Sequence, residues 1–263
     1  MMLDDKIAVI YGAGGGIGGA VARTFAREGA SVFLTGHRLA PVELVAKEID
    51  AAGGSAEPAE VDALDEVAVD THLQRVMDAT GRIDISFNAI GIPNASIVGV
   101  PLTDLDVERF LVPLETYTKS YFLSARLAAR RMVANGSGVI MTVTALHART
   151  GIPLVGGYGP AQAAKEALTR DLSAELAPHG IRVVGLRPQG MPETRTIKDA
   201  YEPRARASAM SSEEWHEMLA ARTHPKRLMT LEEMANVAAF TASDRASGMT
   251  GTIVNLTMGT VDD

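Results

Sequence analysis

The chain has 263 residues, 46% of them hydrophobic and 22% charged, which is typical of one globular α/β domain with a sizeable core. It contains no cysteine, so disulfides, thiolate catalysis and cysteine-bound metal are excluded. The net charge of −7, without a basic stripe, argues against nucleic acid or an anionic membrane as a partner. The amino terminus shows no signal-peptide pattern and no apolar run reaches membrane-spanning length, so we expect a cytoplasmic protein.

Short apolar runs alternate with helical patterns along the chain and predict buried strands. The predicted strands cover residues 7–11, 31–35, 83–87, 139–143, 181–186 and 252–256, with a weaker strand over 55–61 that Pro58 interrupts. Strand–helix alternation of this kind produces a parallel sheet with helices on both faces. We therefore predict an α/β fold with a Rossmann-type, doubly wound sheet of about seven strands, in a single domain spanning residues 1–263.

The helices between these strands are predicted from the spacing of their apolar residues. One face of the first helix carries Ile17, Ala20, Val21, Thr24 and Phe25. A second helix begins at Pro41 and ends at Gly53 and Gly54. The remaining helices cover residues 64–80, 104–134, 158–177 and 231–242. Within the helix over 104–134, Pro113 should kink or interrupt the backbone.

One segment, residues 190–227, is too long for a simple connection between a strand and the last helix. Loops of this length are often lids or binding loops, so its position predicts a substrate lid. Ser211 and Glu214 have the spacing of a capping box and predict a short helix inside the segment. We expect Trp215 on that helix to pack locally.

A glycine-rich turn, Tyr11-Gly12-Ala13-Gly14-Gly15-Gly16-Ile17-Gly18, joins the first predicted strand to the first helix. Glycine lets the backbone turn tightly and approach a pyrophosphate, and the helix that follows offers free N–H groups to the phosphates. A flexible loop is the alternative, but the strand–turn–helix context favours a dinucleotide site.

The spacing of these glycines resembles that of the short-chain dehydrogenase/reductase family, and further matches extend the resemblance over the whole chain. They are Asp62-Ala63, Asn88-Ala89-Ile90-Gly91, Phe110, residues 175–183, Pro188-Gln189-Gly190, Thr194 and Thr250-Gly251. The resemblance implies a nicotinamide dinucleotide cofactor and a small-molecule substrate. The cofactor-binding residues would be Gly12, Gly16, Ile17, Gly18, His37, Arg38, Asp62, Ala63, Asn88, Ala89, Gly91, Tyr158, Gln162, Pro188, Gly190 and Thr194.

The residues after the second strand bear on which cofactor is bound. An acidic side chain there would accept hydrogen bonds from the ribose hydroxyls of NAD(H). The sequence instead has Thr35-Gly36-His37-Arg38, and Arg38 can pair with a 2′-phosphate. This favours NADP(H) over NAD(H), the alternative being a solvated arginine beside bound NAD.

The resemblance also implies how the family carries out its chemistry. A tyrosine transfers the proton, a lysine four residues later lowers the tyrosine pKa, a serine thirteen residues earlier binds the substrate oxygen, and an asparagine holds a water. Tyr158 matches the tyrosine. The lysine position holds Gln162, the serine position holds Ala145, and the asparagine position falls at Tyr117 or Thr118. We expect Lys165, further along the same helix, to be solvated.

Because these helpers differ, Tyr117, His147 and Tyr158 could form another proton-transfer set, with Gln162 assisting. His147 follows the fifth strand, and histidine is a residue type that can donate a proton, although a loop histidine is an equally good interpretation. The remaining histidines show no metal-ligand spacing, so we assign no metal.

Three functions therefore stay open from the sequence. The first is an NADP(H)-dependent oxidoreductase of a small carbonyl or alcohol substrate with an atypical active site. The second is the same scaffold used for non-redox chemistry, and the third is an inactive nucleotide-binding sensor or partner subunit. The resemblance further implies a homo-oligomer, a dimer or tetramer, paired through the helices over 104–134 and 158–177.

Overall fold

A computed structural model describes residues 1–92, 98–195, 205–206 and 209–262 of the chain. Its centre is a parallel sheet of seven strands in the order β3-β2-β1-β4-β5-β6-β7. The strands are β1 (Ile7–Tyr11), β2 (Ser31–Gly36), β3 (Ser55–Glu60), β4 (Ile85–Asn88), β5 (Gly138–Val143), β6 (Ile181–Pro188) and β7 (Thr252–Leu256). The predicted doubly wound fold is confirmed, including the weak third strand with Pro58 inside it.

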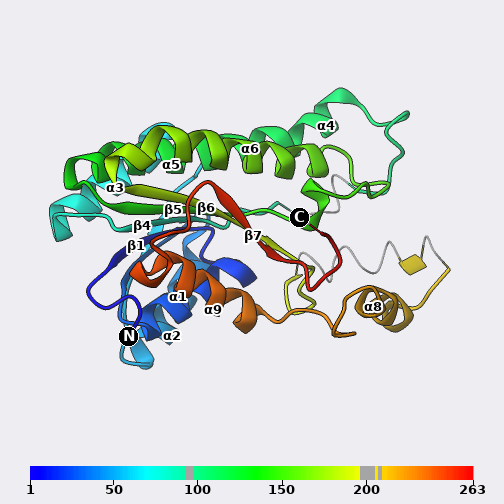
Figure 1. The fold of residues 1–263 in the computed structure, drawn as a ribbon, viewed down its shortest axis with the longest axis horizontal. Coiled ribbons are helices and arrows are strands. Elements are labelled where there is room, and N and C mark those ends of the chain that lie inside the picture. Colours follow the sequence, from blue (N-terminus) through cyan, green and yellow to red (C-terminus); the bar gives the residue numbers. More distant parts are fainter. Residues whose placement is uncertain (93–97, 196–204, 207–208, 263) are drawn as a thin grey trace.

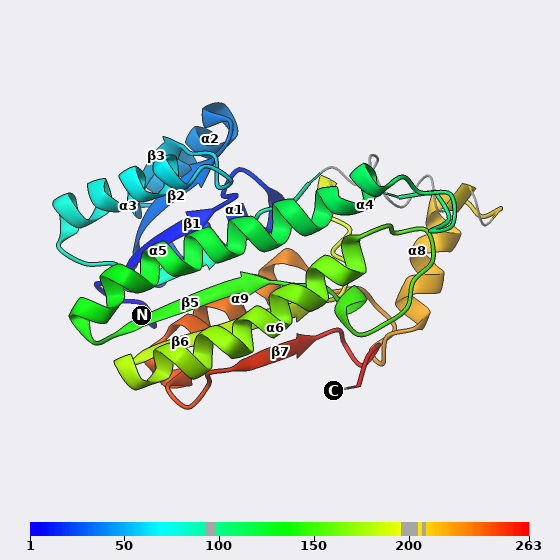
Figure 2. The same cartoon turned by 90° about the horizontal axis from the view of Figure 1, so that it is seen from above.

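Helices cover both faces of the sheet (Figure 1). On one face lie α1 (Gly16–Arg27), α2 (Leu39–Ala51) and α9 (Leu231–Ala242); on the other lie α3 (Glu66–Thr80), α5 (Ser120–Asn135) and α6 (Tyr158–Leu176). In the view from above, α5 and α6 run side by side across the sheet (Figure 2). Both faces are therefore shielded, which is why the central strands β1, β4 and β5 are buried along their whole length.

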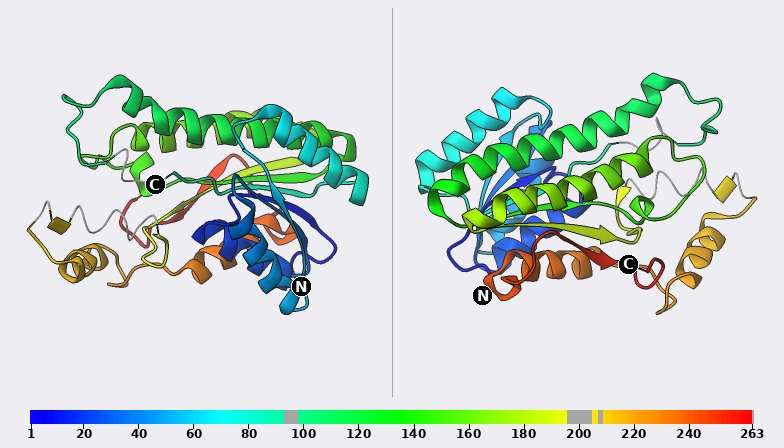
Figure 3. Two further views of the ribbon diagram at one scale, coloured as in Figure 1. Left: turned by 180° about the vertical axis from the view of Figure 1, so that it is seen from behind. Right: turned by 45° about the horizontal axis from the view of Figure 1, so that its top comes forward.

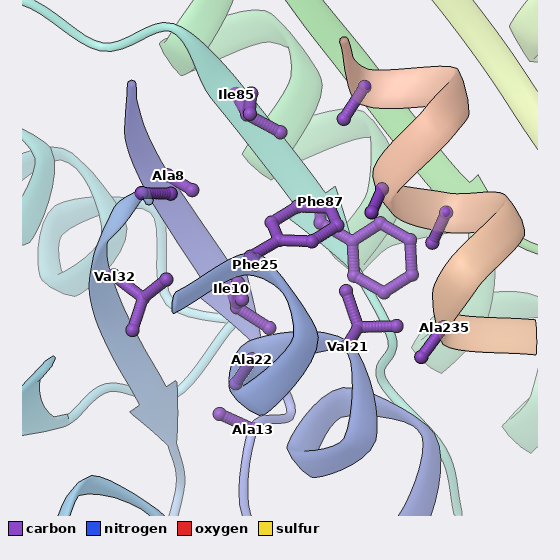
Figure 4. Close-up of a cluster of buried hydrophobic side chains, with 14 of the residues drawn as sticks. Ala8, Ile10, Ala13, Val21, Ala22, Phe25, Val32, Ile85, Phe87 and Ala235 are labelled. Carbon is purple, nitrogen blue, oxygen red and sulfur yellow. The ribbon is translucent and has the colours of Figure 1, made fainter. Parts of the chain in front are cut away.

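Alternate residues of β1 divide the core into two layers. Ala8 and Ile10 pack into the cluster beneath α1 and α9, and Val9 and Tyr11 pack into the cluster beneath α3 and α5. Figure 4 shows the first cluster, in which the rings of Phe25 and Phe87 meet edge to face at 6.1 Å. Adjacent residues of one strand thus hold the two helix layers on the same sheet.

The long helix predicted over 104–134 is divided in the structure. It consists of α4 (Val107–Pro113), a π-helical segment η2 (Leu114–Lys119) and α5. Pro113 has no N–H to donate and its ring crowds the preceding turn, so the regular ladder cannot continue through it. The prediction of an interruption at Pro113 is confirmed, but the single helix is wrong, because Asp106 caps a later start through the backbone N–H of Arg109.

Two other predicted boundaries shift for identifiable reasons. Helix α2 begins at Leu39, so Pro41 lies inside its first turn and not at its start. Strand β4 begins at Ile85 and not at residue 83, because the Asp84 carboxylate turns aside to accept a hydrogen bond from the backbone N–H of Ile7 at 2.7 Å.

The predicted lid segment includes residues 196–204 and 207–208, which lie outside the described residues. Its helix α8 (Ser212–Ala221) has the predicted capping box between Ser211 and Glu214. Helix α8 stands apart from the helix layers, beyond the carboxyl ends of the strands (Figure 3). Trp215 is half-buried, as local packing requires. Within the described residues, no helix is both long and apolar enough to cross a membrane.

We expect His72 to make the fold sensitive to mild acid. Burial, with a smaller contribution from Arg75, lowers the pKa of this α3 side chain from 6.5 to about 4. Between these values the unfolded chain binds the extra proton, so stability falls as the pH drops. The free energy of unfolding should fall by about 2 kcal/mol from this group between pH 6.5 and pH 5.

Urea unfolding across that pH range, in the parent and in His72→Leu, measures this contribution. The substitution should flatten the pH dependence, whereas His179→Leu, at an exposed position, should leave it unchanged. An unchanged slope in His72→Leu would show that this histidine is protonated equally in both states.

Candidate active site

The strand order reverses between β2 and β4 on either side of β1, and the loops that follow β1 and β4 meet there. In open α/β sheets, ligands bind outside the carboxyl ends of the strands at such a switch point. Gly12 has a φ of 77°, and a side chain on it would lie 2.7 Å from the carbonyl oxygen of Ala89. Only glycine therefore allows the two loops to approach this closely.

The first turn of α1 is built to receive an anion. Gly15 caps the helix without any side-chain hydrogen bond, so the first backbone N–H groups stay available to a ligand. Gly14, Gly15 and Gly16 are exposed, whereas Gly18 packs so tightly that a Cβ there would collide with the carbonyl of Gly12. The backbone is thus accessible at residues 14–16, where a pyrophosphate would lie, and tightly packed at Gly18. Ile17, between Gly16 and Gly18, is half-buried.

The turn between β2 and α2 presents charge toward the other end of this cradle. His37 and Arg38 are exposed there, next to the first turn of α2, whose Pro41 packs against Gly14. Glu60, at the end of β3, accepts a hydrogen bond from the backbone N–H of Leu39 at 3.2 Å. An acid therefore reaches this turn from the neighbouring strand, a feature that inspection of residues 35–38 alone missed.

The remaining predicted cofactor residues lie along the same edge of the sheet. Asp62 is exposed and accepts from the N–H of Leu64, and Ala63 is buried. Asn88 is buried and its amide donates to Ser124 at 3.0 Å, which fixes the turn that continues through Ala89 to the exposed Gly91.

Across the sheet edge, the segment after β6 completes the cradle. Pro188 is buried and the half-buried Gly190 donates its N–H to the side chain of Gln189. Thr194 lies against Gly16, 3.1 Å from the position that a side chain there would take. The structure thus brings the β1 loop and the segment after β6 into contact.

Tyr158 opens α6 in the middle of an aromatic cluster. The ring of Tyr117 meets it edge to face at 5.5 Å, and the ring of His147 does so at 5.0 Å. Tyr117 lies on the π-helical segment and accepts a hydrogen bond from the N–H of Ile92 at 3.3 Å. Burial raises the pKa of Tyr117 to about 12, so it stays protonated at neutral pH. The three side chains proposed as a proton-transfer set are therefore in contact.

Gln162 and Ala145 lie in the positions that the resemblance assigns to a lysine and a serine. Gln162 is only 2% exposed, and its Oε1 is buried without a hydrogen-bond partner among the residues that the structure describes. A buried amide oxygen without a partner is costly, so it marks a place where a ligand hydroxyl would fit. Ala145 is also buried and begins the short helix η3 (Leu146–Ala148) that carries His147.

Lys165 is buried, so its predicted exposure to solvent is wrong. Its side chain is 1% exposed, and its ammonium donates to the carbonyl of Val143 at 2.6 Å. The faces of Tyr117 and Tyr121 lie 5.6 and 5.8 Å from Nζ. These three contacts favour the ammonium form, whereas burial lowers the pKa of Lys165 to about 7.

A buried ion pair beside this lysine was not predicted. Glu166 accepts from Arg187 through two hydrogen bonds of 2.7 and 2.9 Å, and both side chains are nearly inaccessible to solvent. The hydroxyl of Thr144 also donates to Glu166, at 3.1 Å. A charged residue inside the apolar run of β6 was the signal in the sequence that could have indicated this pair.

A pocket of about 400 Å³ opens at the segment over 146–152. Its lining residues are Leu146, Thr150, Gly151, Ile152, Arg222 and Thr260. Leu146, one of the lining residues, directly precedes His147, whose ring packs on Tyr158. Within the part of the chain that the structure describes, no three His, Asp or Glu side chains gather as they would around a metal ion.

Comparisons with known proteins agree with this geometry. A family model described as "Enoyl-(Acyl carrier protein) reductase" matches residues 12–260. The 7alpha-hydroxysteroid dehydrogenase of Escherichia coli (strain K12) is 30% identical over 263 residues, which cover 100% of this chain and 97% of that protein. Cis-4-hydroxycyclohexanecarboxylate dehydrogenase of Sinomonas cyclohexanicum is 32% identical over 95% of this chain and 94% of that one.

A solved structure of 7α-hydroxysteroid dehydrogenase with NADH and 7-oxo glycochenodeoxycholic acid superposes with a TM-score of 0.87. It is 30% identical and the match covers 99% of this chain and 96% of that one. The fold and the relatives define an oxidoreductase with a Rossmann-type α/β fold. The chain belongs to the short-chain dehydrogenase/reductase family.

Lys165 should lower the stability of the folded protein at neutral pH. Because its folded pKa of about 7 lies below the ordinary lysine value of 10.5, the unfolded chain holds the proton between these values, and stability rises with pH across them. Lys165→Met should therefore stabilise the protein at pH 7 by about 1–4 kcal/mol, with a smaller gain near pH 10.

Urea unfolding at the two pH values tests this expectation, with Lys119→Met, at an exposed position of the π-helical segment, as the control. A loss of stability in Lys165→Met at pH 7 would mean that the hydrogen bond and the two aromatic faces outweigh the cost of burial.

Proposed function

We propose that the protein is an NADP(H)-dependent oxidoreductase that interconverts a secondary alcohol and its ketone, with Tyr158 as the acid/base. The observation that carries this proposal is the placement of Tyr158, half-buried among Tyr117 and His147, on the sheet edge that also holds the glycine cradle. The nicotinamide would supply or accept the hydride, and the chain's own residues would bind, orient and move the proton.

The residues present fit such a cofactor. The uncapped start of α1 would hold the pyrophosphate, and the unpartnered Oε1 of Gln162 would accept a hydrogen bond from a ribose hydroxyl. At the other end, Arg38 favours a 2′-phosphate and the carboxylate of Glu60 opposes one. The preference for NADP(H) would depend on whether the attraction of the 2′-phosphate to Arg38 exceeds its repulsion by Glu60.

Tyr158 would donate its hydroxyl proton to the oxygen of the ketone, or accept one from the alcohol in the reverse direction. Gln162, four residues on, lies on the same face of α6 but carries no charge, and Ala145 offers no hydroxyl. Tyr117 stays protonated and packs against the Tyr158 ring. His147 is the remaining titratable neighbour whose ring touches Tyr158, so it is the best candidate for a helper.

The substrate class follows from the chemistry of the relatives. Their names specify a hydroxysteroid and a hydroxycyclohexanecarboxylate, each of which has a hydroxyl on a carbocyclic ring. We propose a ring alcohol or ring ketone for this chain as well, bound in the pocket that begins beside His147.

The protein would act in the cytoplasm as a homo-oligomer. The outer surface of α5 exposes Phe122 and Val133, which are 41% and 39% accessible. Burial of such side chains in a helix-to-helix contact would stabilise a dimer or tetramer. Residues 190–227 would form the substrate lid, with α8 at the carboxyl edge of the sheet.

A second candidate function is non-redox chemistry on the same scaffold, with a nucleotide bound for structure alone. The observation in its favour is that Gln162 and Ala145 place neither a charge nor a hydroxyl next to Tyr158. An inactive sensor would share these features, so turnover separates the first function from both others.

The cofactor site is tested by titrating NADPH and NADH while following nucleotide fluorescence. The parent should bind NADPH more tightly, and Arg38→Ala should weaken NADPH about tenfold while leaving NADH unchanged. Glu60→Gln should have the opposite effect: it should tighten the binding of NADPH and leave the binding of NADH unchanged. If neither nucleotide binds, both the oxidoreductase and the nucleotide sensor are refuted, and an unchanged preference in Arg38→Ala would contradict its proposed role.

Turnover is tested with a panel of cyclohexanones and oxosteroids by the loss of NADPH absorbance. Tyr158→Phe keeps the ring in the aromatic cluster and removes only the hydroxyl, so kcat should fall at least a hundredfold while NADPH affinity stays within twofold. An equal kcat in Tyr158→Phe would remove the acid/base assignment. Absence of turnover by the nucleotide-bound parent on every member of the panel would favour the second candidate function.

A further inference from the structure

The pocket at the segment over 146–152 has one charged lining residue, Arg222, which follows α8. Leu146 and Ile152 provide apolar surface, and Thr150 and Thr260 provide hydroxyls. A ring with an anionic substituent matches this lining, because the apolar side chains would cover the ring and the guanidinium would pair with the anion.

The surroundings of Arg222 are cationic in an acidic protein. Between Glu217 and Glu232 the sequence has no acidic residue, whereas it has Arg222, His224, Lys226 and Arg227. Only the last of these is paired with an acid among the described residues, through Glu233 at 2.6 Å. The chain as a whole carries a net charge of −7, so this concentration of positive charge is local.

The opposite wall of the pocket adds to the same field. The loop over 146–152 carries His147 and Arg149 and no acid. His224 packs its ring against Gly259, next to Thr260 of the lining, which brings its imidazole near the pocket. A cleft lined by one sign of charge raises the local concentration of an oppositely charged ligand.

We propose that this pocket binds the acidic group of the substrate through Arg222, so that the substrate is a ring alcohol or ketone carrying a carboxylate. The inference rests on the proposed function, since Leu146 of the lining directly precedes His147, whose ring packs on Tyr158. It adds a specificity-determining residue that the glycine cradle and the aromatic cluster do not contain.

The test compares 4-oxocyclohexanecarboxylate with its methyl ester, two ketones that differ in charge and share the same ring. Binding is measured by ligand-detected NMR with NADP⁺ present, and KM is measured where turnover occurs. The parent should prefer the acid. Arg222→Gln should weaken the binding of the acid about tenfold or more, because one charge-assisted contact is lost. The affinity for the ester should stay within twofold of the parent value.

Matched variants separate charge from structure. Arg222→Lys keeps the charge and should retain part of the preference, and Arg222→Glu should reverse it. Arg170→Ala, at an exposed position of α6, is the control and should change the binding of neither ligand. Added salt should weaken the binding of the carboxylate compound and leave the binding of the ester unchanged.

The outcomes also distinguish this inference from the proposed function. Equal binding of acid and ester, no binding of the acid, or an equal effect of Arg222→Gln on both compounds would overturn the Arg222 assignment. Turnover of uncharged ring ketones that Arg222→Gln leaves unchanged would, in the same experiment, keep the oxidoreductase proposal standing.

Discussion

The buried ion pair between Glu166 and Arg187 is the interaction on which the geometry of the site depends. Its two hydrogen bonds tie α6 to β6, and the hydroxyl of Thr144 adds the end of β5 to the same contact. Removing one partner of such a pair leaves an uncompensated buried charge and costs about 3–5 kcal/mol. Helix α6 therefore cannot slide or rotate on the sheet without losing this contact.

Helix α6 also carries Tyr158, Gln162 and Lys165, so the ion pair fixes their register over the sheet edge. The ammonium of Lys165 is 5.6 Å from the centre of the Tyr117 ring, which in turn is 5.5 Å from the centre of the Tyr158 ring. A buried amine whose pKa burial lowers to about 7, and which carries a positive charge when protonated, thus lies behind the cluster, although the position four residues after Tyr158 is a neutral glutamine. Such a charge acts over longer distances in the protein interior than it would in water.

Much of the fold could be predicted from the sequence, because strand periodicity and the glycine turn are local signals. The parallel sheet of about seven strands follows from short strand patterns that alternate with helices, although their order in the sheet does not. The π-helical segment could not be predicted, since Pro113 indicates an interruption but not how the backbone resumes. The contact of Tyr117 with Tyr158 depends on that segment, so it became visible only in three dimensions.

In the candidate site, too, local motifs could be predicted from the sequence, whereas contacts between distant segments could not. Glycine spacing places the cradle, because the motif lies within one turn and needs no distant partner. Burial of Lys165 and the approach of Glu60 to the β2–α2 turn depend on packing between segments far apart in the chain. A lysine on an amphipathic helix is usually exposed, and here two aromatic rings and a strand carbonyl make the exception.

The distribution of charge connects the two ends of the site. A protein with a net charge of −7 repels anions over most of its surface, yet a dinucleotide is anionic and an acidic substrate would be as well. Groups with positive charge or a positive dipole end are the uncapped start of α1, Arg38 and Arg222, all at the carboxyl edge of the sheet. If both ligands are anions, these positions attract them to the edge where Tyr158 lies, while the acidic remainder of the surface disfavours binding elsewhere.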